Sequence, residues 1–205
     1  MPATLAFPVL VALTACATPV ATGTPSAATP PSTVPSIPPS VTPAPAATVG
    51  LRPSFAPANI DPGLLDHLPP AVDGFPRTRV PESDVIAQND ALVVGAADTA
   101  ITALYTDPVD GQFAHATLVH LRHGVFSDAF LRSWRDAFDA SVCEPAGGVA
   151  GRAEATIGGR KTFIDSCVQG VRTYHLWLQR SSVLVSVSSV GERRLGEKVV
   201  AALTD

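Results

Sequence analysis

Histidine offers the widest chemistry of any side chain in this sequence, because near neutral pH it can act as a base, donate hydrogen bonds or bind a metal ion. His115, His120 and His123 lie close together, in and just after a segment whose composition predicts a strand. Side chains alternate across a strand, so His115 and His123 would share one face and His120 would lie on the other. At about 3.3 Å per residue, His115 and His123 would be roughly 26 Å apart, too far to bind one metal ion. The sequence therefore predicts solvated or partly buried histidines, with no metal site and no cofactor.

His175 and Trp177 are the second candidate pair, because they would occupy one face of a predicted strand over 171–179. In the next predicted strand, 183–190, serines alternate with core-facing valines on what would be the same side as His175. An aromatic ring, an imidazole and hydroxyl groups on one face suit the binding of a small molecule or a partner. The alternative is that a helix or the Pro-rich segment covers Trp177.

No pattern of nucleophilic catalysis is present in the sequence. The serines near residue 186 lack a Gly-x-Ser-x-Gly elbow, and no base or orienting acid can be assigned to them. Gly147-Gly148 and Gly158-Gly159 lack the strand-to-helix context and the lysine of a phosphate loop, so both are expected to be turns. We predict that the protein is not an enzyme. A small envelope hydrolase, or an accessory to one, with His175 or His115 as base, is kept as an alternative.

Cys16 closes the run Leu13-Thr14-Ala15-Cys16 after an apolar stretch that begins at Leu5. This stretch has the length of a secretory signal and is shorter than the roughly 20 residues that span a bilayer. The run resembles the lipobox of bacterial lipoproteins. The resemblance implies removal of residues 1–15, acylation of Cys16 and anchoring of the exported chain to the cell membrane. An ordinary buried thiol in an N-terminal helix is the alternative, which the nearby prolines disfavour.

Residues 16–68 are dominated by Pro, Thr, Ser and Ala, and such a segment cannot bury enough surface to offset its chain entropy. Proline favours extended polyproline II, so about 50 residues could reach on the order of 150 Å from the membrane. We predict a disordered tether, although a Pro-rich ligand for another protein module has a similar composition.

The remainder, 69–205, has the length of one domain with a single core. The net charge of −4 is spread without a basic block, which argues against nucleic acid as a partner. With Cys16 acylated, Cys143 and Cys167 are the two cysteines left to pair in an oxidising compartment. Their bridge would join the end of a long helix to a strand.

Periodicity and turn signals predict an α+β fold, with a mostly antiparallel sheet of about six or seven strands packed against two main helices. Helices are expected after the cap Ser127 and over 192–203. This order of elements loosely resembles the Mog1/PsbP-like domains of secreted lipoproteins. The expected strands are 91–95, 100–105, 113–121, 153–157, 161–167, 171–179 and 183–190.

Together these features predict a membrane-anchored extracytoplasmic lipoprotein whose domain binds an envelope component without catalysis. The bound component could be a protein or a small apolar ligand. Carriage of a lipid between membrane and wall is the alternative within the same architecture, beside the hydrolase named above.

Overall fold

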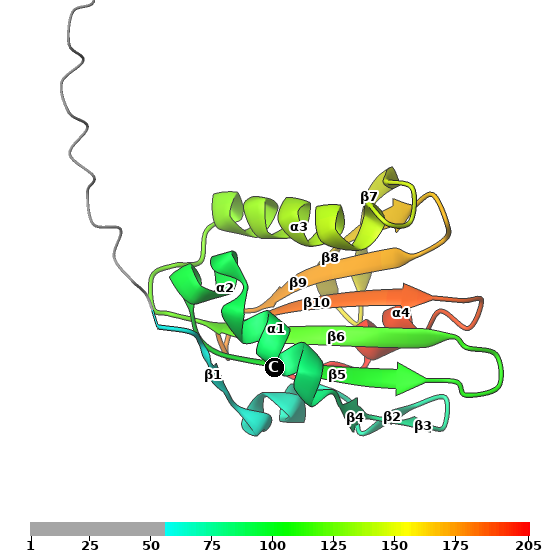
Figure 1. Ribbon diagram of the computed structural model, residues 1–205, viewed down its shortest axis with the longest axis horizontal. Coiled ribbons are helices and arrows are strands. Elements are labelled where there is room, and N and C mark those ends of the chain that lie inside the picture. The colour runs from blue at the N-terminus through cyan, green and yellow to red at the C-terminus, as the bar shows by residue number, and fades with distance from the viewer. Residues whose placement is uncertain (1–55) are drawn as a thin grey trace, which may run out of the picture. The chain divides into compact units, whose positions relative to one another are not determined.

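The computed structural model describes residues 56–205. The predicted signal peptide, the predicted acylation site Cys16 and the predicted tether as far as residue 55 lie outside the described residues. The centre of the described part is one sheet with the strand order β1-β5-β6-β10-β9-β8-β7 (Figure 1). Strand β1 pairs parallel with β5, and the other pairs along this path are antiparallel. The bounds are β1 Asn59–Ile60, β5 Ala97–Thr106, β6 Phe113–Leu121, β7 Val149–Ile157, β8 Arg160–Cys167, β9 Arg172–Leu178 and β10 Val183–Val190.

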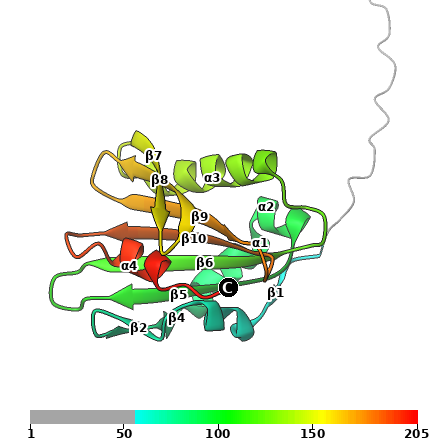
Figure 2. The same ribbon diagram turned by 180° about the vertical axis from the view of Figure 1, so that it is seen from behind.

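Helical elements cover both faces of this sheet (Figures 1 and 2). Three helices lie on one face: α1 (Pro81–Asn89), α2 (Ala91–Ala96) and α3 (Asp128–Cys143). The other face carries the 3₁₀ helix η1 (Pro62–His67), the small hairpin of β2 (Ala71–Val72) and β3 (Phe75–Pro76), and α4 (Leu195–Ala201). Strand β4 (Thr78–Arg79) pairs with β5 on the same edge as β1. The architecture is therefore α+β with a mostly antiparallel sheet, as predicted.

Strict alternation along the strands divides the apolar residues into two cores. In β10, Val183, Val185 and Val187 join the core beneath η1 and α4, whereas Leu184 joins the core beneath α2 and α3. Ser186 lies in β10 between Val185 and Val187 and is fully buried. The valines of β10 thus face the core beneath η1 and α4, and the residues between them face the core beneath α2 and α3.

Most of the predicted elements are confirmed. Strands 113–121 and 183–190 have the predicted bounds. Ser127 caps α3, because its Oγ accepts the amide N–H of Phe130 at 3.1 Å. The predicted strand over 91–95 is wrong, since these residues form α2. Asp90 begins that helix by accepting the amide N–H of Leu92 at 2.8 Å. The hydrophobic periodicity of such a short apolar run does not distinguish a helix from a strand, so the Asp90 cap is the signal that indicates a helix.

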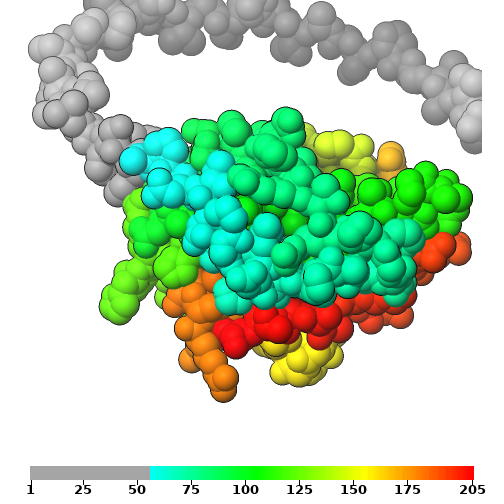
Figure 3. Space-filling model, turned by 90° about the horizontal axis from the view of Figure 1, so that it is seen from below, coloured from blue at the N-terminus to red at the C-terminus, as the bar shows by residue number. Residues whose placement is uncertain are grey.

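The folded part begins before the predicted boundary at residue 68. Ala58, Leu64 and Leu68 are buried, and the amide N–H of Thr204 donates to the carbonyl of His67 at 3.0 Å. In Figure 3 the first described elements lie directly beside the C-terminal segment. Proline-rich composition predicts disorder here, but Pro62 at the first turn and Asp61 as cap begin a 3₁₀ helix that buries Leu64.

Cys143 and Cys167 form the predicted disulfide, with their Cα atoms 5.1 Å apart. The bridge ties the last residue of α3 to the last residue of β8. Both sulfurs lie in a small buried cluster with Ala146, against which Val142 and Val171 pack. The disulfide thus joins one end of α3 to the sheet.

Opening this disulfide should destabilise the domain. Bridging residues 24 positions apart restricts the unfolded chain, and in the loop-entropy model this contributes about 3 kcal/mol. We expect a reducing agent to lower the melting temperature by roughly 6 to 12 °C, measured by circular dichroism. The Cys143→Ala/Cys167→Ala double variant is the control, because a reducing agent should leave its lower melting temperature unchanged. Equal melting curves of the oxidised and reduced wild-type chain would contradict the assignment.

Candidate functional site

Helix α3 is held on the sheet by a buried chain of hydrogen bonds. The indole N–H of Trp134 donates to Ser186 Oγ at 2.8 Å, and Ser186 Oγ lies 2.9 Å from Nδ1 of His175. His175 Nε2 lies 2.9 Å from Asp139 Oδ1, which also accepts the hydroxyl of Thr173 at 2.5 Å. His175, Ser186, Asp139 and Thr173 have no exposed surface, and Trp134 is 4% exposed. These partners assign the tautomer, because Nε2–H donates to the carboxylate and Nδ1 accepts the serine hydroxyl.

Ser186, His175 and Asp139 stand in the order of a Ser–His–Asp triad, yet their surroundings differ from those of an active site. Ser186 Oγ already accepts from Trp134 and donates to His175, and all three residues of the triad are sealed under α3. A nucleophile needs an open approach for the substrate and donors for the developing oxyanion. In this conformation the hydrogen bonds of these three residues hold α3 against the sheet.

The predicted open face of His175 and Trp177 is therefore closed. His175 lies beneath α3. Its ring makes a T-shaped contact with the ring of Phe138, with the two ring centroids 5.2 Å apart. Trp177 is half-buried and stacks on Phe126 with ring centroids 4.1 Å apart. It lines a separate hollow of about 370 Å³ near the start of α3. Helix α3 thus covers His175, whereas Trp177 stays partly exposed beside Phe126 of the loop before α3.

A second buried acid, Asp165 of β8, lies against Asp139. Burial raises the pKa of Asp165 to about 7, and the Asp139 carboxylate adds to this rise, while the guanidinium of Arg152 opposes it. Burial also raises the pKa of Asp139, but hydrogen bonds from His175, Asp165 and Thr173 outweigh it and hold this pKa at about 2. Asp165 is therefore the member of the pair that takes up a proton first as the pH falls.

Helix α1 is held on the sheet by its own buried carboxylate. Asp84, with no exposed surface, accepts the backbone N–H of Thr102 at 2.7 Å and the Thr102 hydroxyl at 2.8 Å. Its second oxygen accepts from Nε of Arg79 at 2.7 Å. Along the outer edge of β5, strand β1 pairs with residues as far as Ala100, and strand β4 pairs with residues from Ala103 onward. Asp84 thus takes the edge amide that lies between the two short strands.

A groove lies between these two anchored walls, with β5 and β6 as its floor. Its volume is about 270 Å³, and a hollow of about 80 Å³ between α2 and α3 adjoins it past Trp134 and Phe138. Together they lie at the lower end of the range for small-ligand sites, roughly 300 Å³ and above. The walls are mainly apolar, whereas the floor and rim carry hydroxyl and ionisable groups. The apolar members are Ile86, Ala87, Val93, Trp134 and Phe138, and the polar members are Ser83, Asp90, Thr102, His115, Thr117 and Ser141.

His115 is the ionisable group on the floor of this groove. Its Nε2 is buried and, among residues 56–205, has no hydrogen-bond partner. Burial lowers the pKa of His115, and the charge of Asp84 opposes this shift only in part. The imidazole is therefore neutral near pH 7, and its buried nitrogen can make one hydrogen bond to a molecule in the groove.

The other two histidines lie outside the groove. His120 lies opposite Val183 in the register of β6 and β10, and Val183 belongs to the core beneath η1 and α4, on the other face of the sheet from the groove. Its Nδ1 lies 4.0 Å from the carboxylate of Asp98. His123 is exposed. Within 56–205, no three or more His, Cys, Asp or Glu side chains gather as a metal site. None of the described helices combines the length and apolarity needed to cross a membrane.

Sequence reasoning missed Asp84, Asp139 and Trp134 as site residues. A signal for Asp139 exists, because it lies on the same helix stripe as Leu131 and Cys143, which are buried. A carboxylate on a buried stripe requires a polar partner on the facing strand, and His175 was the nearest candidate.

Replacing Asp165 by Asn should change how stability depends on pH. Since the pKa of this carboxyl in the folded chain is about 7 against an ordinary 3.8, the folded state binds more protons than the unfolded state between these values. Wild-type stability should therefore fall as pH rises through that window and level off above it. Asp165→Asn cannot ionise, so its melting temperature should exceed that of the wild type by several degrees at pH 8, by less at pH 5 and by little below pH 4.

Asp136→Asn is the matched control, because Asp136 is exposed on α3 and also lies near Arg152. It should keep the wild-type pH profile in thermal melts. Parallel profiles for the wild type and Asp165→Asn would contradict the raised pKa.

Comparison of the chain with models of protein families, with curated proteins and with solved structures found no match. The lipobox and Mog1/PsbP-like resemblances therefore stay predictions from the residues themselves.

Proposed function

We propose that the protein is an extracytoplasmic lipoprotein, anchored by acylated Cys16, whose domain binds a small apolar ligand in the groove between α1 and α3 without catalysis. The observation that carries the proposal is the buried Nε2 of His115, which has no hydrogen-bond partner within residues 56–205, in a groove with mainly apolar walls. A buried polar atom without a partner is costly, and a ligand with one hydrogen-bonding group would remove that cost.

The charges around the groove favour an uncharged ligand. Asp90 lies at the rim, and the Asp84 carboxylate lies close enough to His115 to raise its pKa. Two carboxylates near one floor disfavour an anionic headgroup. Because the imidazole is neutral, it offers a hydrogen bond and no charge. An alcohol or an ester with an apolar body fits this chemistry best.

The apolar walls supply the binding energy for the body of such a ligand. Burial contributes about 25 cal/mol per Å² of apolar surface, and Trp134 and Phe138 present aromatic surface at low entropic cost. Both wall helices are fixed by buried carboxylates, so the ligand would not have to order them. A preformed groove of this kind suits a carrier or sensor of small apolar molecules at the membrane.

A protein partner is the second candidate, favoured by exposed apolar residues beside the groove. Ile86 is 73% exposed and Val85 is 50% exposed, both on α1. A partner could cover this strip and insert one apolar side chain into the groove. In that case the groove should bind isolated small ligands poorly.

Filling the groove should abolish ligand binding. The probe is 1-octanol, titrated into the mature chain with Cys16→Ser so that no acyl chain competes, with heat and tryptophan fluorescence as readouts. Ser141→Trp places an indole at the groove, and we expect no measurable octanol binding. Ser133→Trp, on the exposed side of α3, is the control and should bind octanol like the parent.

His115→Phe separates the role of the imidazole from that of the walls. Losing one hydrogen bond of about 1 kcal/mol should weaken octanol about fivefold. Octanoate should bind the parent chain more weakly than octanol. The proposal fails if the parent chain does not bind octanol or if Ser141→Trp binds it equally well.

The anchor is tested separately in cells. Labelled palmitate should enter the wild-type product, and the Cys16→Ser chain should leave the membrane fraction, because several acyl chains together give stable attachment at about 0.8 kcal/mol per buried CH₂. Ala17→Ser is the control and should keep both label and membrane attachment. Label on Cys16→Ser would contradict acylation at this residue.

A further inference from the structure

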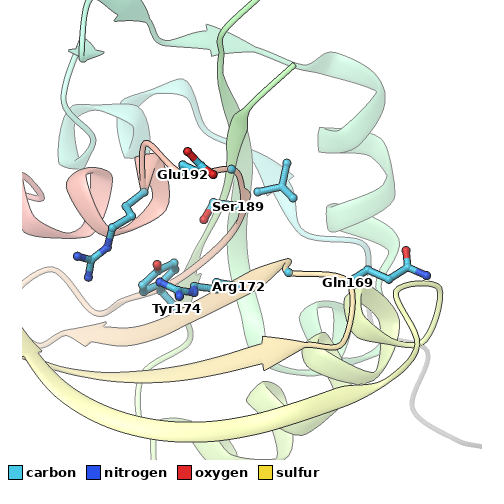
Figure 4. Close-up of a pocket in the computed structure, with 9 residues that line it drawn as sticks. Gln169, Arg172, Tyr174, Ser189 and Glu192 are labelled. Atoms are coloured by element: carbon cyan, nitrogen blue, oxygen red, sulfur yellow. The ribbon is translucent and has the colours of Figure 1, made fainter. Parts of the chain in front are cut away.

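A second hollow lies on the other face of the sheet, where α4 packs. It measures about 700 Å³ and is bordered by the turn between β8 and β9 and by the connection from β10 to α4. Figure 4 shows Arg172 beside Tyr174, and Glu192 beyond Ser189 on the other side of the hollow. Its size falls within the range of small-ligand sites, roughly 300 to 1,000 Å³. It shares no lining residue with the groove between α1 and α3.

The floor of this hollow is rigid. Tyr174 is 1% exposed and Ser189 is 4% exposed, and α4 packs tightly on both. A Cβ added at Gly196 would lie 2.5 Å from Ser189 Oγ and 2.8 Å from Cε2 of Tyr174. Burial raises the pKa of the Tyr174 phenol, and hydrogen bonds with Arg172 and Ser189 oppose that rise. The phenol is therefore neutral and helps to fix the Arg172 side chain at the floor.

Two opposite charges line the hollow without an ionic partner. Arg172 and Glu192 form no ion pair within 4.0 Å in the part of the chain that the structure describes. Their neighbours differ, because Arg193 pairs with Asp107 and Asp110, and Arg194 pairs with Glu197. An arginine can bind a carboxylate through two parallel N–H donors, and a glutamate can accept from an ammonium group.

We propose that this hollow binds a short peptide with free ends, whose C-terminal carboxylate pairs with Arg172 and whose N-terminal ammonium pairs with Glu192. A zwitterion satisfies both charges at once, which neither an anion nor a cation does. The hollow is larger than a single amino acid requires, so the peptide is expected to have two or more residues. Tyr174 and Ser189 form the rigid floor beneath the backbone between the two ends.

The test compares three forms of one probe, Ala-Ala-Ala, by isothermal titration with the full mature chain. The unblocked peptide should bind, and the N-acetylated and the C-amidated forms should each bind at least tenfold more weakly. Raising the salt concentration should weaken the unblocked form most, because it makes two partly exposed ion pairs whereas each blocked form keeps only one.

Variants then assign each end of the peptide. Arg172→Gln should bind the amidated and unblocked forms equally, and Glu192→Gln should bind the acetylated and unblocked forms equally. Arg180→Gln, an exposed arginine on the turn between β9 and β10, is the control and should keep the wild-type ranking. Melting curves should match the wild type for all three, since these side chains are exposed.

The proposal is overturned if millimolar unblocked peptide does not bind, if the three forms bind equally to the wild type, or if Arg172→Gln and Glu192→Gln keep the wild-type ranking. Stronger binding of free alanine than of the tripeptide would also overturn it, because a single amino acid would then span the distance between Arg172 and Glu192 and no peptide would be needed. These outcomes do not depend on octanol binding on the other face.

Discussion

The carboxylate of Asp139 is the group on which the arrangement of the candidate groove depends. It is fully buried, and a buried charge persists only with hydrogen-bonding partners, which His175 and Thr173 provide from the sheet. Removing one hydrogen-bond partner of such a buried carboxylate typically costs about 1 to 3 kcal/mol or more, because the charged acceptor is left unsatisfied. The same helix places Trp134 on Ser186, so the polar chain that fixes α3 also fixes the aromatic wall of the groove.

Asp84 does for α1 what Asp139 does for α3. Each wall helix carries one buried carboxylate, and each carboxylate accepts from a threonine hydroxyl of the strand beneath. Apolar packing alone would leave the helices free to slide, since dispersion contacts have no direction, whereas hydrogen bonds fix register. The groove is therefore preformed, and His115 is held in it with a nitrogen that no group of the described part of the chain satisfies. That combination is the basis for assigning the groove to an uncharged apolar ligand.

Local patterns predicted what is local in this fold. Alternation gave β6 and β10 their bounds, the Ser127 cap marked the start of α3, and two remaining cysteines predicted the bridge. Contacts between distant residues were not predictable. Asp139 and His175 are 36 positions apart, and only the folded topology shows that a helix carboxylate lies over that strand. The early folded segment escaped for a related reason, because its prolines predict disorder while its two buried leucines, Leu64 and Leu68, find their core in tertiary contacts.

Helix α3 also connects the two faces of the molecule. Its middle sets the groove through Asp139, and its last residue, Cys143, is bonded to Cys167 at the start of the turn that borders the peptide hollow. That turn is held further by the amide of Gln169, which donates to the carbonyl of Ala146 at 3.0 Å. Strand β9 completes the link, since His175 faces α3 while Arg172 and Tyr174 line the hollow on the opposite face. Helix α3 is therefore the element that holds both the wall of the groove and the turn that borders the hollow.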